Sequence, residues 1–286
     1  MKKMIIAGAG QMGMSVSQLL NETNIHLTAF ADNSPNKWKD GDIPVVSFTD
    51  AIAMNPDIIL IGVLDDERAG SMREQFDALG YSGEYIFLGD IYNTYDMRGG
   101  AFRRFIPRLD SVPGAVAELG VYKGDFSLEL RRQFPGKVLY LFDTFEGFNA
   151  DDVKIEAAAS FSQSKPEDFT DTSAEYVLGR FDDTSDIVLR KGYFPDTAAG
   201  LENEAFAFVS LDADLYAPTF AGLEFFYPRL SPGGAILLHD YGSRRFSGVF
   251  EAVSDYEKKY GKLLLVPLCD LHKSCIILHP YLKTYY

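Results

Sequence analysis

Two glycine-containing turns in this chain of 286 residues have the residue types and spacing of nucleotide-binding loops. In the first, Gly8, Gly10 and Gly13 form the pattern G-x-G-x-x-G after a short apolar run, and Asp32 follows nineteen residues later. Such glycines permit a tight turn and a close main-chain approach to a diphosphate, and the acid stands where a ribose would bind. In many domains the same pattern has a purely structural role, which is to pack a strand tightly against a helix. The first turn therefore predicts either a site for NAD or another nucleotide, or a purely structural turn.

The second turn joins the apolar run at 116–119 to a helical segment and contains Glu118, Gly120 and Gly124. These glycines would let the main chain approach S-adenosylmethionine, with Glu118 near the charged amino-acid end of the ligand. Asp143 ends the next apolar run, where a carboxylate can accept both ribose hydroxyls. An acid at a strand end is also a common helix cap, so this turn alone is a weak signal.

Polar side chains that could perform catalysis follow two later apolar runs. Asp212 and Asp214 come after the run at 205–211, while His239 ends the run at 235–239 and Asp240 follows it. Neighbouring parallel strands end at the same edge of a sheet, so we expect these side chains to converge there. Turn formation, helix capping or packing at a strand end would explain the same residues without chemistry.

The elements that must position these residues alternate between strands and helices, which predicts parallel sheets and an α/β fold. We expect strands at 4–7, 25–31, 58–63 and 85–88, with helices at 11–21 and 67–79, in a small Rossmann-like domain over residues 1–96. Residues 97–112 are expected to be a partly helical linker. The second domain, 113–286, is expected to have strands at 116–119, 138–142, 187–191, 205–211 and 235–239, helices at 124–134, 219–227 and 248–260, and a final hairpin of 263–268 and 274–278.

The composition narrows the classes of function. A net charge of −14 argues against binding to nucleic acid or to an anionic membrane surface. The apolar runs are too short to cross a bilayer, and the first one leads directly into Gly8, so we expect a cytoplasmic protein without a signal peptide. Cys269 and Cys275 are expected to be free, buried thiols. His272 and His279 flank the last strand and are expected to be surface groups.

The C-terminal two-thirds of the chain resembles the macrocin O-methyltransferase family. The resemblance is carried by PGAVAELGVYKG at 113–124, LFDTFEGF at 141–148, KGYFPDT at 191–197, LDADLY at 211–216, YPRLSPGG at 227–234 and HDY at 239–241. It implies a class I methyltransferase fold with a reversed final strand, making the chain two tandem Rossmann-like three-layer domains. It also implies methyl transfer from S-adenosylmethionine to a hydroxyl of a sugar, a glycan precursor or a related small molecule.

The resemblance further implies a divalent cation, Mg²⁺ or Mn²⁺, held by Asp212, His239 and Asp240, which would lower the pKa of the acceptor hydroxyl. Asp212, Asp214 and His239 are the expected catalytic residues. The expected contacts of S-adenosylmethionine are Glu118, Gly120, Tyr122, Gly124, Asp143, Thr144, Gly192, Tyr193, Phe194 and Asp212.

Two departures from the family pattern leave alternatives open. Histidine stands at 239, where relatives commonly have an acid, and it suits Mg²⁺ less well than Mn²⁺, Fe²⁺ or Zn²⁺. The acidic segment at 149–171, expected to be a flexible surface loop or a lid, contains no histidine that could act as the general base. A non-catalytic protein that binds S-adenosylmethionine and an NAD-dependent oxidoreductase working through the first domain are the two competing hypotheses. The sequence does not decide whether the chain forms a homo-oligomer.

Overall fold

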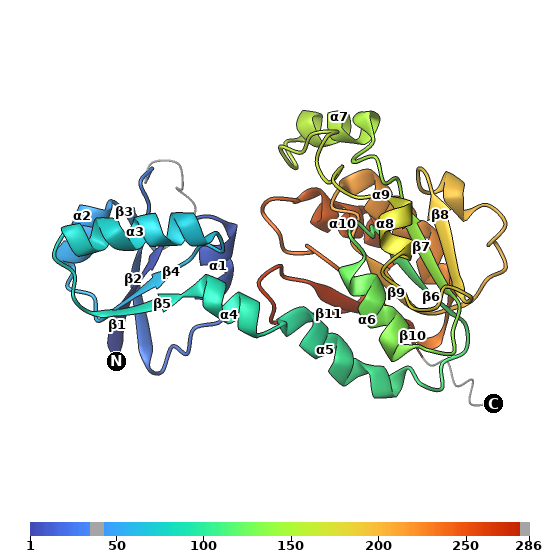
Figure 1. Ribbon diagram of the computed structural model, residues 1–286, viewed down its shortest axis with the longest axis horizontal. Coiled ribbons are helices and arrows are strands. Elements are labelled where there is room, and N and C mark those ends of the chain that lie inside the picture. The colour runs from blue at the N-terminus through green and yellow to red at the C-terminus, as the bar shows by residue number, and fades with distance from the viewer. Residues whose placement is uncertain (35–42, 281–286) are drawn as a thin grey trace. The chain divides into compact units, whose positions relative to one another are not determined.

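The computed structural model describes residues 1–34 and 43–280, and the chain divides into two compact units (Figure 1). Unit 1 comprises Met1–Met97 together with Cys269–Leu271, and unit 2 comprises Arg98–Leu268 and the chain from His272 onward. Each unit has a mainly parallel sheet with helices on both faces. The predicted α/β class is therefore confirmed.

Unit 1 is built on a parallel sheet of five strands in the order β3-β2-β1-β4-β5. The strands are β1 (Lys2–Ala7), β2 (Ile25–Ala31), β3 (Val45–Val46), β4 (Ile58–Ile61) and β5 (Glu84–Phe87), and the helices are α1 (Gln11–Ser17), α2 (Phe48–Ala53), α3 (Asp66–Ala78) and α4 (Leu88–Thr94). Successive side chains of β1 enter different cores. Ile5 packs with Phe76 of α3, and Ile6 with Val16 of α1. The sheet is thus covered on both faces, which explains its nearly continuous apolar strands.

Unit 2 is built on a sheet of seven strands in the order β11-β12-β10-β9-β6-β7-β8. The strands are β6 (Ala115–Leu119), β7 (Leu139–Asp143), β8 (Ile187–Lys191), β9 (Phe206–Leu211), β10 (Leu230–Leu238), β11 (Leu264–Pro267) and β12 (Cys275–Leu278). β12 runs antiparallel to both of its neighbours, while the pairs from β10 to β8 are parallel. The reversed final strand agrees with the prediction.

Helices cover both faces of the second sheet. α9 (Tyr216–Phe226) and α10 (Gly248–Tyr260) share one core with it, and α5 (Met97–Phe105), α6 (Asp125–Gln133) and α8 (Ala174–Leu178) contribute to the other. α7 (Ala150–Ala159) lies close to α9 and is drawn at the top of this unit in Figure 1. Three single 3-10 turns complete the unit, at Ile106–Arg108, Asp196–Ala198 and Tyr227–Arg229.

The linker is partly helical, as expected, whereas one expected loop contains a helix. The expected linker at 97–112 contains α5, whose Phe102 is 1% exposed and packs 4.9 Å from the ring of Phe208. This apolar anchor attaches the segment to unit 2. The polar segment at 149–171 contains α7, which begins at the cap Asn149. Among the described residues no helix is long and apolar enough to cross a membrane. Cys275 is buried, as expected, but Cys269 is exposed.

Candidate active site

The residues predicted to carry chemistry in unit 2 lie at the carboxyl ends of β6, β7, β9 and β10. Backbone hydrogen bonds keep these ends together, because the amide of Asp212 donates to the carbonyl of Leu119 at 2.8 Å and that of His239 to Leu211 at 2.9 Å. The predicted convergence at one edge is therefore what the sheet produces.

The turn after β6 needs glycine for a reason internal to the protein. Gly120 has a φ of +87°, and a Cβ atom there would lie 1.9 Å from the carbonyl oxygen of Asp212. Only a residue without a side chain allows the two strand-end loops to come this close. Gly124, with a φ of +78°, begins α6 in the left-handed conformation. Tyr122 between them also has a positive φ of 50°.

Asp143 is joined directly to this turn. Its Oδ2 accepts hydrogen bonds from the amides of Val121 at 2.7 Å and Tyr122 at 2.8 Å, and its Oδ1 accepts one from the amide of Phe145 at 2.7 Å. Thr144 beside it donates its hydroxyl proton to the carbonyl of Gly147 at 2.6 Å. The predicted proximity of Asp143 to the turn of Gly120 is present, and the acid also holds that turn in shape.

Glu118 is buried at the end of β6, with 2% of its surface exposed. The hydroxyl of Ser127 donates a hydrogen bond to its carboxyl group. Burial raises the pKa of Glu118 to about 8, with the nearby charge of Asp212 acting in the same direction and the Ser127 hydrogen bond opposing it.

The end of β8 places its three predicted residues differently. Gly192 donates its amide proton to the carbonyl of Asp143 at 2.9 Å. Tyr193 reaches Asp152 through its hydroxyl. Phe194 is 4% exposed, and its ring stacks 5.5 Å from that of Phe226 in the core. Phe194 therefore belongs to the aromatic core beneath this edge.

Two acids of α7 point into the protein. Asp152 and Glu156 are 5% and 1% exposed, although an acidic loop segment predicts solvated side chains. Oε1 of Glu156 accepts a hydrogen bond of 2.7 Å from the amide of Tyr216 at the start of α9. Burial raises the pKa of both carboxyl groups. The two acids are four residues apart, so they lie on one face of the helix. This spacing was the signal in the sequence that could have indicated their shared orientation.

The acidic residues after β9 and β10 form one cluster with a histidine. Candidate ligand atoms of Asp212, Asp214, His239 and Asp240 all lie within 4.8 Å of one another. Nδ1 of His239 is 2.8 Å from Oδ1 of Asp212 and 2.9 Å from Oδ2 of Asp240. Asp214 and Asp240 have positive φ values of 60° and 53°, an uncommon conformation that is concentrated at functional sites.

The charges of the acids and bases in this cluster shift one another's pKa values. Burial opposes ionisation of Asp212, but His239 and Arg98 hold its pKa below the ordinary value. Burial likewise disfavours charge on His239, whose pKa is nevertheless raised to about 10, chiefly by Asp212. Burial and the charges of Asp212 and Asp240 raise the pKa of Asp214 well above its usual range. The negative charges of the acids are thus balanced within the cluster by His239 and Arg98.

Two basic members of the site were not predicted. Arg98, from the expected linker, places Nη1 2.9 Å from Oδ2 of Asp212. His272, expected at the surface, lies with its ring 4.7 Å from that of His239 and forms a second potential ligand set with His239 and Asp240. His272 is half-buried, because the loop between β11 and β12 returns to the edge where β10 ends. His279 is half-buried, with its ring 5.8 Å from Tyr227.

In unit 1 the first glycine turn is also held by its own acid. A Cβ atom at Gly13 would lie 2.0 Å from the carbonyl oxygen of Gly8, so packing alone requires this glycine. A Cβ atom at Gly10 would contact no described atom within 4 Å. Asp32 accepts hydrogen bonds from the amides of Ala9 at 3.1 Å and Ser34 at 2.8 Å. Gly13 and Asp32 therefore have a structural explanation.

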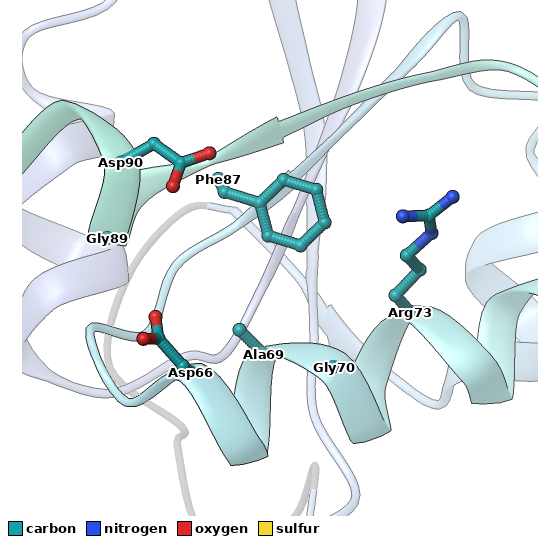
Figure 2. Close-up of a pocket in the computed structure, with 7 residues that line it drawn as sticks. All are labelled: Asp66, Ala69, Gly70, Arg73, Phe87, Gly89 and Asp90. Atoms are coloured by element: carbon teal, nitrogen blue, oxygen red, sulfur yellow. The ribbon is translucent and has the colours of Figure 1, made fainter.

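Unit 1 also contains an open pocket of about 280 Å³ beside α3. Figure 2 shows that the side chains of Asp66, Phe87 and Asp90 surround it near the starts of α3 and α4, with Arg73 further along α3. None of the residues predicted to bind a nucleotide lines this pocket, whose full lining is Asp66, Ala69, Gly70, Arg73, Phe87, Gly89 and Asp90.

Comparison with known proteins assigns most of unit 2 to a known family. The model of the macrocin-O-methyltransferase (TylF) family matches residues 104–278. The chain is 30% identical over 164 residues to 8-demethyl-8-(2,3-dimethoxy-alpha-L-rhamnosyl)-tetracenomycin-C 4'-O-methyltransferase of Streptomyces olivaceus, covering 53% of this chain and 61% of that protein. It is 30% identical over 166 residues to mycinamicin III 3''-O-methyltransferase of Micromonospora griseorubida, covering 53% of this chain and 63% of that protein. The fold resembles the structure of the O-methyltransferase NovP with a TM-score of 0.53, at 22% identity, covering 64% of this chain and 80% of that chain.

Proposed function

Because this chain belongs to the macrocin-O-methyltransferase (TylF) family, we propose that it transfers the methyl group of S-adenosylmethionine to a hydroxyl of a sugar, a glycan precursor or a related small molecule. The chain spans less than two-thirds of the length of each curated relative described above. The observation that carries the proposal is the position of Asp143 against the turn of Gly120, next to the cluster of Asp212 and His239.

The methyl donor is assigned to the edge between β6, β7 and β8. Oδ2 of Asp143 already accepts two amide protons, whereas Oδ1 accepts one and keeps capacity for a ribose hydroxyl. We assign Glu118 to the charged amino-acid end of the donor. The remaining contacts are assigned to the main chain and side chains at Gly120, Tyr122, Gly124, Thr144, Gly192, Tyr193 and Asp212.

The acceptor hydroxyl is assigned to the cluster of Asp212, Asp214 and His239. An alcohol is a poor nucleophile at neutral pH, so its proton must be removed as it attacks the methyl carbon of the sulfonium. Asp214 is the proposed base, because its carboxyl group belongs to the cluster to which the acceptor hydroxyl is assigned. A divalent cation bound by Asp212, His239 and Asp240 would lower the pKa of the hydroxyl.

Calorimetry on the full chain tests the donor site. We expect S-adenosylmethionine and S-adenosylhomocysteine to bind, and Asp143→Ala to weaken both by about 10-fold or more, since each lost charged hydrogen bond contributes about 1.5–3 kcal/mol. Asp32→Ala is the matched control, because Asp32 holds the corresponding place after β2. NAD is titrated in parallel. Binding of NAD without binding of S-adenosylmethionine would favour the oxidoreductase hypothesis and contradict the proposal.

Mass spectrometry tests turnover. The protein is incubated with S-adenosylmethionine and a panel of glycosides and nucleotide sugars, and we expect a product heavier by one methylene unit together with S-adenosylhomocysteine. Asp214→Asn should abolish the product while leaving the affinity for S-adenosylhomocysteine unchanged. Donor binding with no product from any acceptor would instead support a non-catalytic binding protein.

A further inference from the structure

We propose that the cluster of unit 2 binds a divalent ion of the first transition series, such as Co²⁺ or Fe²⁺, in preference to Mg²⁺, and that His272 is a ligand. The inference deepens the proposed function, since it concerns the cation at the site to which methyl transfer is assigned. Its support, however, comes only from the side-chain atoms that could ligate a metal ion.

Two overlapping sets of donor atoms meet at this place. The candidate ligand atoms of His239, Asp240 and His272 lie within 4.8 Å of one another, and so do those of Asp212, Asp214, His239 and Asp240. His239 and Asp240 belong to both sets. The imidazole rings of His239 and His272 lie 4.7 Å apart at an angle of 35°. One ion near the shared residues would therefore be within reach of two imidazoles and more than one carboxylate.

Buried polar atoms at the shared residues lack partners in the described structure. Asp240 is 3% exposed, and its Oδ1 has no hydrogen-bond partner there. Nδ1 of His239 approaches two carboxylate oxygens at 2.8 and 2.9 Å, yet makes no hydrogen bond of acceptable geometry with either. Leaving a buried charged group unsatisfied costs stability, and an ion coordinated by these atoms would remove that cost.

The chemistry of the donors selects the class of ion. Mg²⁺ prefers an octahedron of oxygen ligands and keeps several waters. Imidazole nitrogen suits Zn²⁺, Fe²⁺, Co²⁺ and Ni²⁺ better, and affinity rises along the series from Mn²⁺ to Ni²⁺. Two histidines among the carboxylates therefore favour a transition-metal ion.

The structure also offers a way to neutralise the buried acids of the cluster without a metal ion. His239 lies between Asp212 and Asp240, and Arg98 contacts Asp212 at 2.9 Å, so these cations could neutralise the acids by themselves. In that case the cluster would bind neither class of metal. A titration distinguishes the two arrangements.

The experiment uses the full chain after treatment with a chelator. Co²⁺ and Mg²⁺ are titrated separately in a calorimeter, and the visible absorption of Co²⁺ reports nitrogen ligation. We expect Co²⁺ to bind at least about 10-fold more tightly than Mg²⁺. His272→Ala should weaken Co²⁺ by about 10-fold or more and change its spectrum. His26→Ala is the control, because His26 is exposed on β2 and outside the cluster.

His239→Asp provides a second variant with the opposite expectation. Replacing one imidazole by a carboxylate should shift the preference toward Mg²⁺, and circular dichroism shows whether each variant is folded. Equal affinities for the two ions, unchanged Co²⁺ binding in His272→Ala, or no binding of either ion would overturn the proposal. Binding of S-adenosylhomocysteine, measured without metal, separates this failure from a failure of the proposed methyl transfer.

Discussion

The hydroxyl of Tyr193 donates a hydrogen bond of 3.0 Å to Oδ1 of Asp152, which joins the end of β8 to helix α7. Burial and the Asp152 carboxylate raise the pKa of Tyr193 to about 12, so the phenol stays protonated and remains the donor at neutral pH. Together with the contact of Glu156 to the amide of Tyr216, this hydrogen bond fixes α7 against the edge that holds the candidate active site.

Tyr193→Phe should loosen α7. Removing the hydroxyl leaves the buried Asp152 without this donor, at a cost of about 1–3 kcal/mol. We expect faster hydrogen exchange in α7, with a smaller change of exchange in β9 and β10. We also expect a higher KM for the acceptor. Tyr176→Phe is the control, since Tyr176 is 52% exposed. Unchanged exchange in α7 would show that this contact does not hold the helix.

Gly120→Ala should destabilise unit 2 severely. The new Cβ atom would lie 1.9 Å from the carbonyl oxygen of Asp212, in a backbone conformation that disfavours alanine. We expect a loss of about 3 kcal/mol or more in the free energy of unfolding, measured by chemical denaturation. Gly136→Ala is the matched substitution, because a Cβ atom there meets no described atom within 4 Å. Similar losses in both variants would contradict this account of Gly120.

Gly10 and Gly13 of the first turn should respond differently to alanine. Gly13→Ala would force a Cβ atom to 2.0 Å from the carbonyl oxygen of Gly8, whereas Gly10→Ala meets open space. We expect Gly13→Ala to lower the stability of unit 1 by about 2 kcal/mol or more and Gly10→Ala to lower it by less than about 1 kcal/mol. Hydrogen exchange of β1 and β4 measures both. A large loss in Gly10→Ala would reveal a constraint other than packing.

The burial of Glu118 should make stability depend on pH. Its pKa rises from 4.5 to about 8 in the folded chain, so the folded state binds this proton more tightly than the unfolded state. Its contribution is therefore greatest below pH 4.5 and is lost as the pH rises toward 8, by about 1.4 kcal/mol per pH unit.

Glu118→Gln removes this titration. We expect the variant to gain stability relative to the wild type as the pH increases from 5 to 8, as measured by denaturation at each pH. Glu167→Gln, at an exposed position, is the control and should show no such trend. A difference between Glu118→Gln and the wild type that stays constant with pH would mean that Glu118 is ionised in the folded protein.

The regular elements of the fold could be predicted wherever an apolar pattern was long enough. The sequence predicted the bounds of β2, β8 and α10 as the structure has them. The helices α2, α4, α7 and α8 were not predicted. α2, α4 and α8 have at most seven residues, and α7 is rich in acidic residues, so none shows a clear apolar period of 3.6.

The candidate site was predictable where strand order alone determines proximity. Asp212, His239 and Asp240 follow strands that pair in parallel, so their meeting follows from the topology. Arg98 reaches Asp212 from a position 114 residues earlier in the chain, and His272 reaches His239 through a loop. No periodic pattern encodes such contacts, because they depend on the path of the chain outside regular elements.

The contact between Gly120 and the carbonyl of Asp212 joins the two halves of the candidate site through main chain alone. No side chain separates them, so substitutions elsewhere cannot readily change the spacing between the turn of Gly120 and the loop of Asp212. Under the proposed function, diversification toward new acceptors would then occur in α7 and the loop that carries His272, while this joint keeps its spacing.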